Sequence, residues 1–366
     1  MPPKTSSKDV STLTSRRARL PRLPPTSSFE TAELLRACVP AHRALGAFEQ
    51  CCRQSPVSDV ASETFKWLNA AAALQLDGTL CSLRELLISP ESHRPEGLAR
   101  YVSQTNSASS RLPSEPVGSV LALELASGLS AKTATVRRDK LSPAGKHIVK
   151  SPPVGAEHLQ MLLENWQGFV RQDAGSLDPL LVAGAAHGQW VALQPFTHAN
   201  TVTGQILTSL LLVEEGLIAS PVLPLIHTFA KNSDNYWIHL DGAISEGKRD
   251  NWLRHFLQEI ETSAVHATRV MMAWQAHLDL LFEKLPKLLP KTPSAELVRL
   301  CGTPSFGISD LADAGISRRQ TATAWMQRLV DAGLLKESRV GKEKRYVNPA
   351  ILKLILNQIS NLKSDI

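Results

Sequence analysis

Three stretches of the chain carry apolar residues at the three- and four-residue spacing of an α-helix, and this periodicity constrains the fold most strongly. The residues are Leu159, Leu162, Leu163, Trp166 and Phe169; then Ile206, Leu207, Leu210, Leu211 and Val213; and finally Trp252, Leu253, Phe256, Leu257 and Ile260. Residues at this spacing share one face of a helix, which is buried against another element. The pattern therefore predicts a mainly α protein with a common helical core.

Length and composition describe an ordinary globular chain with room for two or three domains. It has 366 residues, of which 43% are hydrophobic and 20% charged. No apolar run reaches the roughly 18 residues that span a bilayer, and the N-terminus lacks the apolar core of a signal peptide. The five cysteines form no Cys-x-x-Cys pair, which argues against a disulfide framework or a zinc site. We expect a cytoplasmic protein with reduced thiols, no membrane contact and no metal site.

Residues 1–22 form a basic tail. They contain six lysines and arginines against one aspartate, and Ser, Thr and Pro outnumber the apolar residues. Such a composition cannot bury enough apolar surface to fold, so we expect disorder. The tail is either a solvated leader or a non-specific contact for nucleic acid.

The region 23–103 is expected to be helical. One helix is predicted over Ala32–Phe48 and a second over Val60–Leu76, ending where Gly78 can adopt the left-handed conformation. Ser82 is then expected to cap a third helix, with Glu85 three residues on. The apolar face of the first helix comprises Leu34, Leu35, Cys38 and Leu45.

The region 104–155 differs because Ser, Gly, Pro and Lys dominate it. Short β-compatible runs occur at 133–136 and 147–149, which predicts a hairpin or flap. Helical periodicity returns after Pro153, so the flap is expected to interrupt a helical core over 104–290.

Residues 291–350 predict a winged helix-turn-helix, followed by a C-terminal helix over 351–366. The expected elements are, in order, a helix over Ala295–Leu300, a helix over Asp310–Ala314 capped by Ser309, a third helix opened by a capping box over Ser317–Gln320, and two strands within Leu334–Val347. The apolar face of the third helix comprises Ala322, Trp325, Met326, Leu329 and Val330.

The segment Gln194–Gln205 runs Gln-Pro-Phe-Thr-His-Ala-Asn-Thr-Val-Thr-Gly-Gln and resembles the Fic signature, His-Pro-Phe-x-Asp/Glu-Gly-Asn-Gly/Lys-Arg-x-x-Arg. Ala185–Trp190 resembles the helix that leads into it, and residues 23–350 fit the order of Fic regions. The resemblance implies a helical core in which a loop and the next helix N-terminus hold nucleotide phosphates. It also implies AMP transfer from ATP, with magnesium, onto a hydroxyl of a target protein, and a homodimer.

The chain departs from this signature where the signature carries its chemistry. Gln194 replaces the catalytic histidine and has no titratable group near neutral pH. His198 replaces the metal-binding acid and adds no negative charge for Mg²⁺. Val202 and Gln205 replace both phosphate-binding arginines. The remnant of the nucleotide-binding loop comprises Phe196, Ala199, Asn200 and Thr201. Ala199 and Thr201 stand where the signature has glycine, so the backbone is less able to wrap a phosphate closely.

A second motif is similarly altered. Ala73–Gly78 resembles the family's inhibitory helix, Ser/Thr-x-x-x-Glu-Gly/Asn, whose glutamate pairs with the second signature arginine. Here Asp77 replaces the glutamate, Ala73 replaces the hydroxyl residue, and the arginine partner is Gln205. The motif is therefore expected to be a plain helix end, with Ala73, Asp77 and Gly78 as its remnant.

The winged helix is the strongest binding candidate. The candidate DNA contacts are Arg318, Arg319, Gln320, Thr323 and Gln327 on the third helix, with Lys342, Lys344 and Arg345 on the wing. Arg and Gln suit guanine and adenine edges, and wing cations suit phosphates. The alternative is a winged helix used for protein contacts or dimerisation.

We therefore expect a Fic-like protein with a degenerate, inactive motif that acts by DNA or protein binding. No cofactor is then required, and ATP and Mg²⁺ matter only if activity is retained. One alternative is an active transferase with an altered site, moving AMP or another phosphate-containing group. Another is a nucleotide sensor that binds without transfer.

Overall fold

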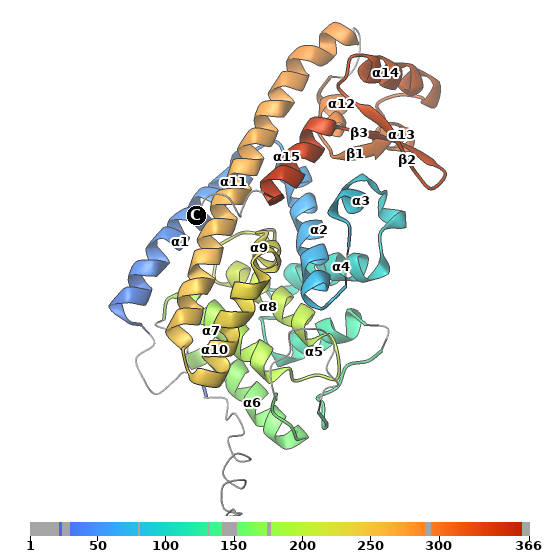
Figure 1. Ribbon diagram of the computed structural model, residues 1–366. Helices are drawn as coiled ribbons and strands as arrows, with labels where there is room; N and C mark the ends of the chain where they lie inside the picture. The colour runs from blue at the N-terminus through green and yellow to red at the C-terminus, as the bar shows by residue number, and fades with distance from the viewer. Residues whose placement is uncertain are drawn as a thin grey trace, which may run out of the picture.

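The computed structural model describes residues 22–23, 30–79, 81–130, 132–140, 152–173, 177–289 and 294–360. Its organising element is α11, a 40-residue helix over Arg249–Leu288 that runs from the lower helical body to the upper C-terminal domain (Figure 1). α1 (Ala32–Gln54) packs along α11. One face of α11 is buried from Trp252 to Leu285, and this face joins the two ends of the molecule.

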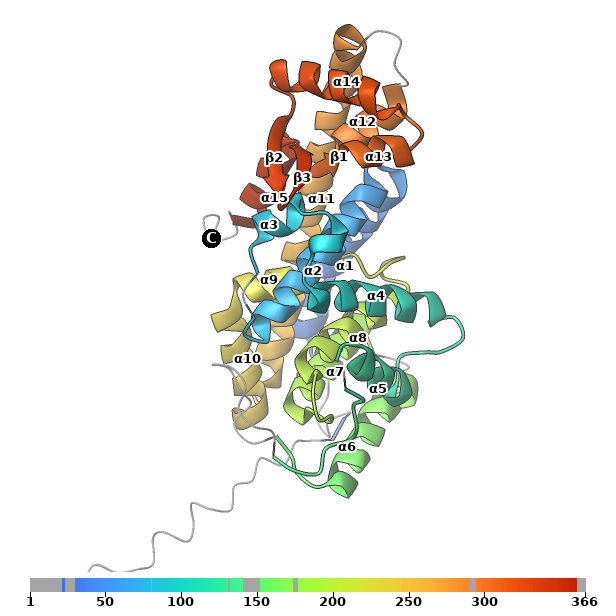
Figure 2. The ribbon, with the colours of Figure 1, turned by 90° about the vertical axis from the view of Figure 1, so that its right-hand side faces the viewer.

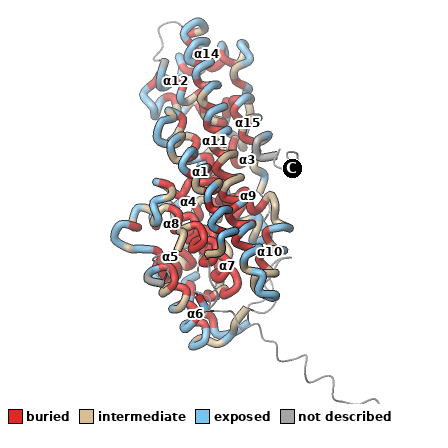
Figure 3. The backbone as a smooth tube through the Cα atoms, turned by 90° about the vertical axis from the view of Figure 1, so that its left-hand side faces the viewer, coloured by how far each residue is buried: buried red, intermediate tan, exposed pale blue. Residues whose placement is uncertain are grey.

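The other helices of the body surround two central ones, α7 (Pro179–Leu193) and α8 (Asn200–Glu214). They are α2 (Ser58–Leu76), α3 (Leu83–Ile88), α4 (Glu96–Arg111), α5 (Ser119–Gly128), α6 (Ala156–Gly168), α9 (Leu225–Lys231) and α10 (Ser233–Glu246), with the short turns η1 (Glu91–His93) and η2 (Phe169–Asp173). Every residue of α7 after Pro179 is buried, and Figure 3 shows buried residues concentrated around α7 and α8. None of the described helices is long and apolar enough to cross a bilayer.

An aromatic cluster surrounds His187 at the centre of α7. Its imidazole stacks on Trp252 with ring centroids 5.7 Å apart. Its Nδ1 lies 2.7 Å from Thr208 Oγ1, and its Nε2 lies 2.8 Å from the Tyr236 hydroxyl. Burial lowers the pKa of His187 to about 3, so the imidazole is neutral at physiological pH. His187 is therefore a hydrogen-bonded core residue.

The C-terminal domain has the element order of a winged helix, which confirms the expected topology. α12 (Ser294–Cys301) and α13 (Ile308–Asp313) pack on β1 (Ser305–Gly307), and α14 (Arg319–Asp331) packs on α13. The antiparallel sheet has the order β1-β3-β2. The remaining elements are β2 (Lys336–Val340), β3 (Glu343–Val347) and α15 (Pro349–Ser360), which returns to α11 and α3 (Figure 2).

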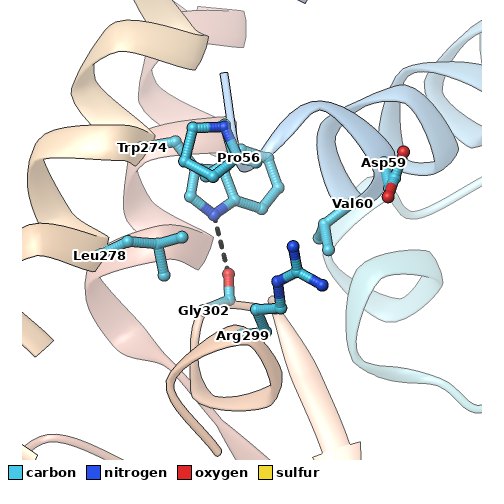
Figure 4. Close-up of a pocket in the computed structure, with 8 residues that line it drawn as sticks. Pro56, Asp59, Val60, Trp274, Leu278, Arg299 and Gly302 are labelled. Atoms are coloured by element: carbon cyan, nitrogen blue, oxygen red, sulfur yellow. Dashed lines mark hydrogen bonds between the residues drawn. The ribbon is translucent and has the colours of Figure 1, made fainter. Parts of the chain in front are cut away.

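Trp274 of α11 fixes this domain to the body. Its indole Nε1 donates a hydrogen bond of 2.8 Å to the carbonyl of Gly302, which follows α12 (Figure 4). The ring is fully buried beside a cavity of about 90 Å³ that Pro56 and Val60 of the body line together with Arg299 of α12. The winged helix is therefore packed against the body rather than tethered to it.

The predicted C-terminal end of α2 and the predicted start of α3 are confirmed, whereas other helix boundaries differ from the prediction. Gly78 has a φ of 94° after α2, and the Glu85 N–H donates to Ser82 Oγ at 3.3 Å at the start of α3. α1 continues past the predicted Phe48 to Gln54, and Leu35 is on its exposed side.

Two predicted caps in the winged helix are wrong. α13 begins at Ile308 rather than Asp310, because the Asp310 carboxylate accepts from the Gly307 N–H (2.8 Å) and caps the helix from inside its first turn. α14 begins at Arg319 without a side-chain cap. Ser317 Oγ instead donates to the Arg318 carbonyl at 3.2 Å, so the expected capping box does not form.

The region 104–155 is more helical than its composition suggested, since α4 continues to Arg111 and α5 follows. Residues 132–140 include the first predicted β run, and a single bridge joins Val136 to Phe196 of the segment resembling the signature. The second run, at 147–149, lies outside the described residues, as do the predicted basic tail before Arg22 and residues 361–366 of the predicted C-terminal helix.

Candidate functional site

The segment that resembles the Fic signature forms a tight loop between α7 and α8. Gln194 and Ala199 have φ values of 41° and 58°, the two positive values for non-glycine residues in the described part of the chain. Asn200 Nδ2 donates to the Phe196 carbonyl and Asn200 Oδ1 accepts from the Phe196 N–H, both at 2.8 Å. The Trp190 indole donates to the Asn200 carbonyl at 2.9 Å. These bonds fix the loop as it enters the N-terminus of α8.

Residues 132–140 lie along this loop. The Thr197 N–H donates to the Thr135 carbonyl at 3.0 Å. His198 Nε2 lies 2.9 Å from the Lys132 carbonyl oxygen. Because a carbonyl oxygen only accepts, this contact requires a proton on Nε2. The segment therefore holds the His198 ring with one nitrogen already committed to the backbone.

Arg137 binds the C-terminal end of α7, a role that its position in a polar segment does not indicate. Its Nε donates to the Gln194 carbonyl (2.6 Å), its Nη2 to the Leu193 carbonyl (3.1 Å) and its Nη1 to the Asp139 carbonyl (3.1 Å). The side chain is buried, and burial lowers its pKa. The guanidinium thus pairs with carbonyl groups that the last turn of a helix leaves without partners.

We expect Arg137→Ala to lower the free energy of unfolding by about 2–3 kcal/mol, because buried carbonyl groups lose charged donors. Arg138→Ala is the matched control, since the neighbouring Arg138 is exposed, and it should stay within about 0.5 kcal/mol of the wild type. Urea denaturation followed by circular dichroism measures both. Equal stability of the two variants would contradict the assigned role.

The signature positions hold little charge. Val202 and Gln205 are buried within α8, at 5% and 1% exposure. Neither amide atom of the Gln205 side chain has a hydrogen-bond partner among the described residues. Gln194 and His198 are half-buried in the loop. The two positions at which the signature has arginine are thus neutral and belong to the core of the body.

The inhibitory-motif remnant is an ordinary helix end. Asp77 is the exposed C-cap of α2, and its N–H donates to the Ala73 carbonyl at 3.2 Å. Ala73 is fully buried and Gly78 has the left-handed backbone that follows many helices. α2 packs on α8, but its end contributes no ion pair with α8 among the described residues.

Residues 279–351 match the family model of the C-terminal domain of SoFic-like protein adenylyltransferases. The whole fold is similar to a Fic family protein from Desulfovibrio desulfuricans G20, with a TM-score of 0.53, 12% identity and coverage of 87% of this chain and 97% of that one. This chain has a Fic fold.

Other solved structures are similar to parts of this Fic-fold chain. Fic-1 of C. elegans (residues 134–508) gives a TM-score of 0.48 at 16% identity, over 66% of this chain and 73% of that one. A Fic domain containing signaling protein from Bacteroides thetaiotaomicron gives 0.47 at 14% identity, over 63% of this chain and 97% of that one.

Within the Fic fold, the remnant residues serve mainly the loop itself. Phe196 is buried against Trp190 with ring centroids 5.6 Å apart, and the Asn200 side chain is bonded to the loop backbone. Ala199 and Thr201 are half-buried at the start of α8. No group of three or more His, Cys, Asp or Glu among the described residues is placed to hold a metal ion.

The first helical turn and one face of α14 form a polar, exposed surface. Arg318, Arg319, Gln320, Thr323 and Gln327 are all exposed. In the described part of the chain, no acidic group lies within 4.0 Å of either arginine head group. Figure 2 shows α14 at the top of the molecule, away from the helical body.

Two of the three cations predicted to contact phosphates on the wing, Arg345 and Lys344, have acidic partners within the domain. Arg345 is buried at 7% exposure, its Nη1 lies 3.4 Å from Asp310 Oδ2, and its Nη2 donates to the Ser305 carbonyl at 3.3 Å. Its side chain therefore holds β3 to β1 and α13, and the expected phosphate contact is wrong for this residue. Lys344 is exposed but paired with Glu337. Of the three predicted wing contacts, Lys342 is the one that is exposed and has no ion pair among the described residues.

Proposed function

We propose that this Fic-fold protein has lost nucleotidyl transfer and binds DNA through its winged helix. The observation that carries the proposal is the distribution of charge. The signature positions Gln194, Val202 and Gln205 supply neither a base nor a cation. Arg318 and Arg319 are exposed at the start of α14 and have no acidic partner among the described residues. Transfer of a phosphoryl-linked group needs the first set of charges, and DNA binding needs the second.

The position of α14 in the domain supports this use. In helix-turn-helix proteins the second helix enters the major groove and its N-terminal residues contact base edges. Arg318 and Arg319 are at that end, and Gln320 and Thr323 continue the same exposed face. The exposed Lys342 on the wing adds a phosphate contact.

The test is binding of the full chain to labelled genomic fragments at about 50 mM salt, by mobility shift and fluorescence anisotropy. We expect Arg318→Ala combined with Arg319→Ala to weaken binding about 100-fold, since each base or phosphate contact contributes roughly 1–3 kcal/mol. The slope of log affinity against log salt should fall by about 2.

The matched control removes two exposed arginines far from the winged helix, Arg36 and Arg43 of α1. This variant has the same net charge and should bind within about threefold of the wild type. If the wild type gives no mobility shift, or if the two double variants bind equally well, the proposal of DNA binding through α14 is contradicted. A winged helix used for protein contacts would then be the better account.

A further inference from the structure

A cavity of about 90 Å³ lies beside Trp274, where the C-terminal domain meets the body (Figure 4). Its floor is apolar, because Trp274 and Leu278 of α11 are buried at 0% and 3% exposure, and Val57 before α2 is buried as well. The Trp274 indole N–H is already bonded to the Gly302 carbonyl. The floor therefore offers a ligand the indole ring and two aliphatic side chains.

The mouth of this cavity carries two opposite charges. Arg299 of α12 and Asp59 of α2 both line it, and both residues are exposed. Figure 4 shows the Arg299 side chain extending from α12 toward α2. Within the described part of the chain, neither side chain has a hydrogen bond or an ion pair within 4.0 Å, with the other or with any further group. The two charges are thus free to bind a ligand that carries both an anionic and a cationic group.

The size of the cavity limits what this ligand can be. One water molecule takes up about 30 Å³ in the liquid, so the cavity has room for about three waters, or about six non-hydrogen atoms. Alanine has this size and combines a carboxylate, an ammonium group and a methyl group. A guanidinium binds a carboxylate through two parallel hydrogen bonds, and a carboxylate accepts hydrogen bonds from an ammonium group. The charges and the apolar floor therefore match a small amino acid.

We propose that this cavity binds a small zwitterionic amino acid, with the carboxylate on Arg299, the ammonium group on Asp59 and the side chain against Trp274. Such a ligand contacts both parts of the molecule, since α12 belongs to the C-terminal domain and α2 to the body. Its binding stabilises their packed arrangement by mass action. The proposal is independent of DNA binding and of nucleotidyl transfer, because the lining residues lie outside α14 and outside the α7–α8 loop.

Isothermal titration calorimetry of the full chain with L-alanine, glycine and L-serine tests the site. We expect the tightest of the three to bind with a dissociation constant on the order of 0.1 mM, which is within the limit for a ligand of so few atoms. Propionate lacks the ammonium group and ethylamine lacks the carboxylate. Each should bind at least ~10-fold more weakly than L-alanine, because one charged hydrogen-bonding group is lost.

Two variants identify the groups that hold the ligand. Arg299→Gln and Asp59→Asn each remove one charge and should each weaken the binding of L-alanine at least ~10-fold. Arg328→Gln is the matched control for the first, since Arg328 is also an exposed arginine in the last turn of a helix of the C-terminal domain. Asp234→Asn is the control for the second, since Asp234 and Asp59 are both exposed in the first turn of a helix.

Both control variants should bind L-alanine like the wild type, and circular dichroism checks that every variant is folded. The proposal is overturned if the wild type binds none of the three amino acids at millimolar concentration. It is also overturned if propionate binds as tightly as L-alanine, or if Arg299→Gln, correctly folded, keeps the wild-type affinity. None of these results bears on the mobility shift with DNA, so the two proposals can fail separately.

Discussion

Gly204→Ala is expected to lower the free energy of unfolding by about 3 kcal/mol, because the added methyl group would overlap a buried tryptophan ring. A Cβ at this position of α8 would lie 2.3 Å from Trp190 Cδ1 and 2.9 Å from Nε1. Trp190 cannot easily give way, because it is fully buried, its Nε1 donates to the Asn200 carbonyl, and its ring packs edge-on against Trp166. The close approach of α7 and α8 thus depends on the absence of a side chain.

Gly46→Ala is the matched control, since Gly46 also lies within a helix, α1. Apart from its sequence neighbours and the adjacent backbone of α1, no atom of the described residues lies within 4 Å of the Cβ that this substitution adds. Alanine should here stabilise the protein by roughly 0.5–1 kcal/mol, because glycine loses more backbone entropy on folding. Urea denaturation of both variants measures the difference. A similar, small effect at both positions would show that α7 and α8 can separate without cost, against the packing described.

The helical body and the winged helix could be predicted because their signals are local. Apolar periodicity identified the buried faces of α6, α8 and α11, and Gly78 and Ser82 marked helix ends whose geometry depends on adjacent residues. The signature gave the position of the α7–α8 loop for the same reason.

The rest depends on contacts between residues far apart in the sequence. Arg137 is one of two adjacent arginines in a polar segment, and only the fold selects it over Arg138 to bond with the end of α7. Arg345 follows Lys344 in a basic turn, yet Arg345 is buried in β3 and its guanidinium lies 3.4 Å from the Asp310 carboxylate. Composition alone could not distinguish these buried cations from exposed ones.

The two N-caps that were predicted wrongly, those of α13 and α14, also depend on the surrounding hydrogen bonds. Ser309 and Ser317 both stand in the sequence where an N-cap is common, but Asp310 caps α13 from within and moves its start to Ile308. The Asp310 carboxylate, three residues after Gly307, is charged and is therefore a stronger hydrogen-bond acceptor than a serine hydroxyl. Sequence patterns therefore indicate the presence of these helices better than their first residue.

The rate of AMP transfer by this protein should be no higher than the background rate without enzyme. Loss of a positioned base alone costs roughly 100- to 10,000-fold in rate. Gln194 cannot take a proton, and the buried Val202 and Gln205 cannot neutralise phosphate charge. His198, the titratable side chain in the loop, has its Nε2 proton directed at the Lys132 carbonyl.

Transfer of label from ATP measures directly whether this protein has lost nucleotidyl transfer. The full chain is incubated with ATP labelled in the α-phosphate, Mg²⁺ and a cell lysate, beside an active Fic transferase as positive control. We expect no labelled protein above a no-enzyme background, for the wild type and for His198→Ala alike. Label on any protein that appears with the wild type and is lost with His198→Ala would show a working, rebuilt site and contradict the proposed loss of transfer.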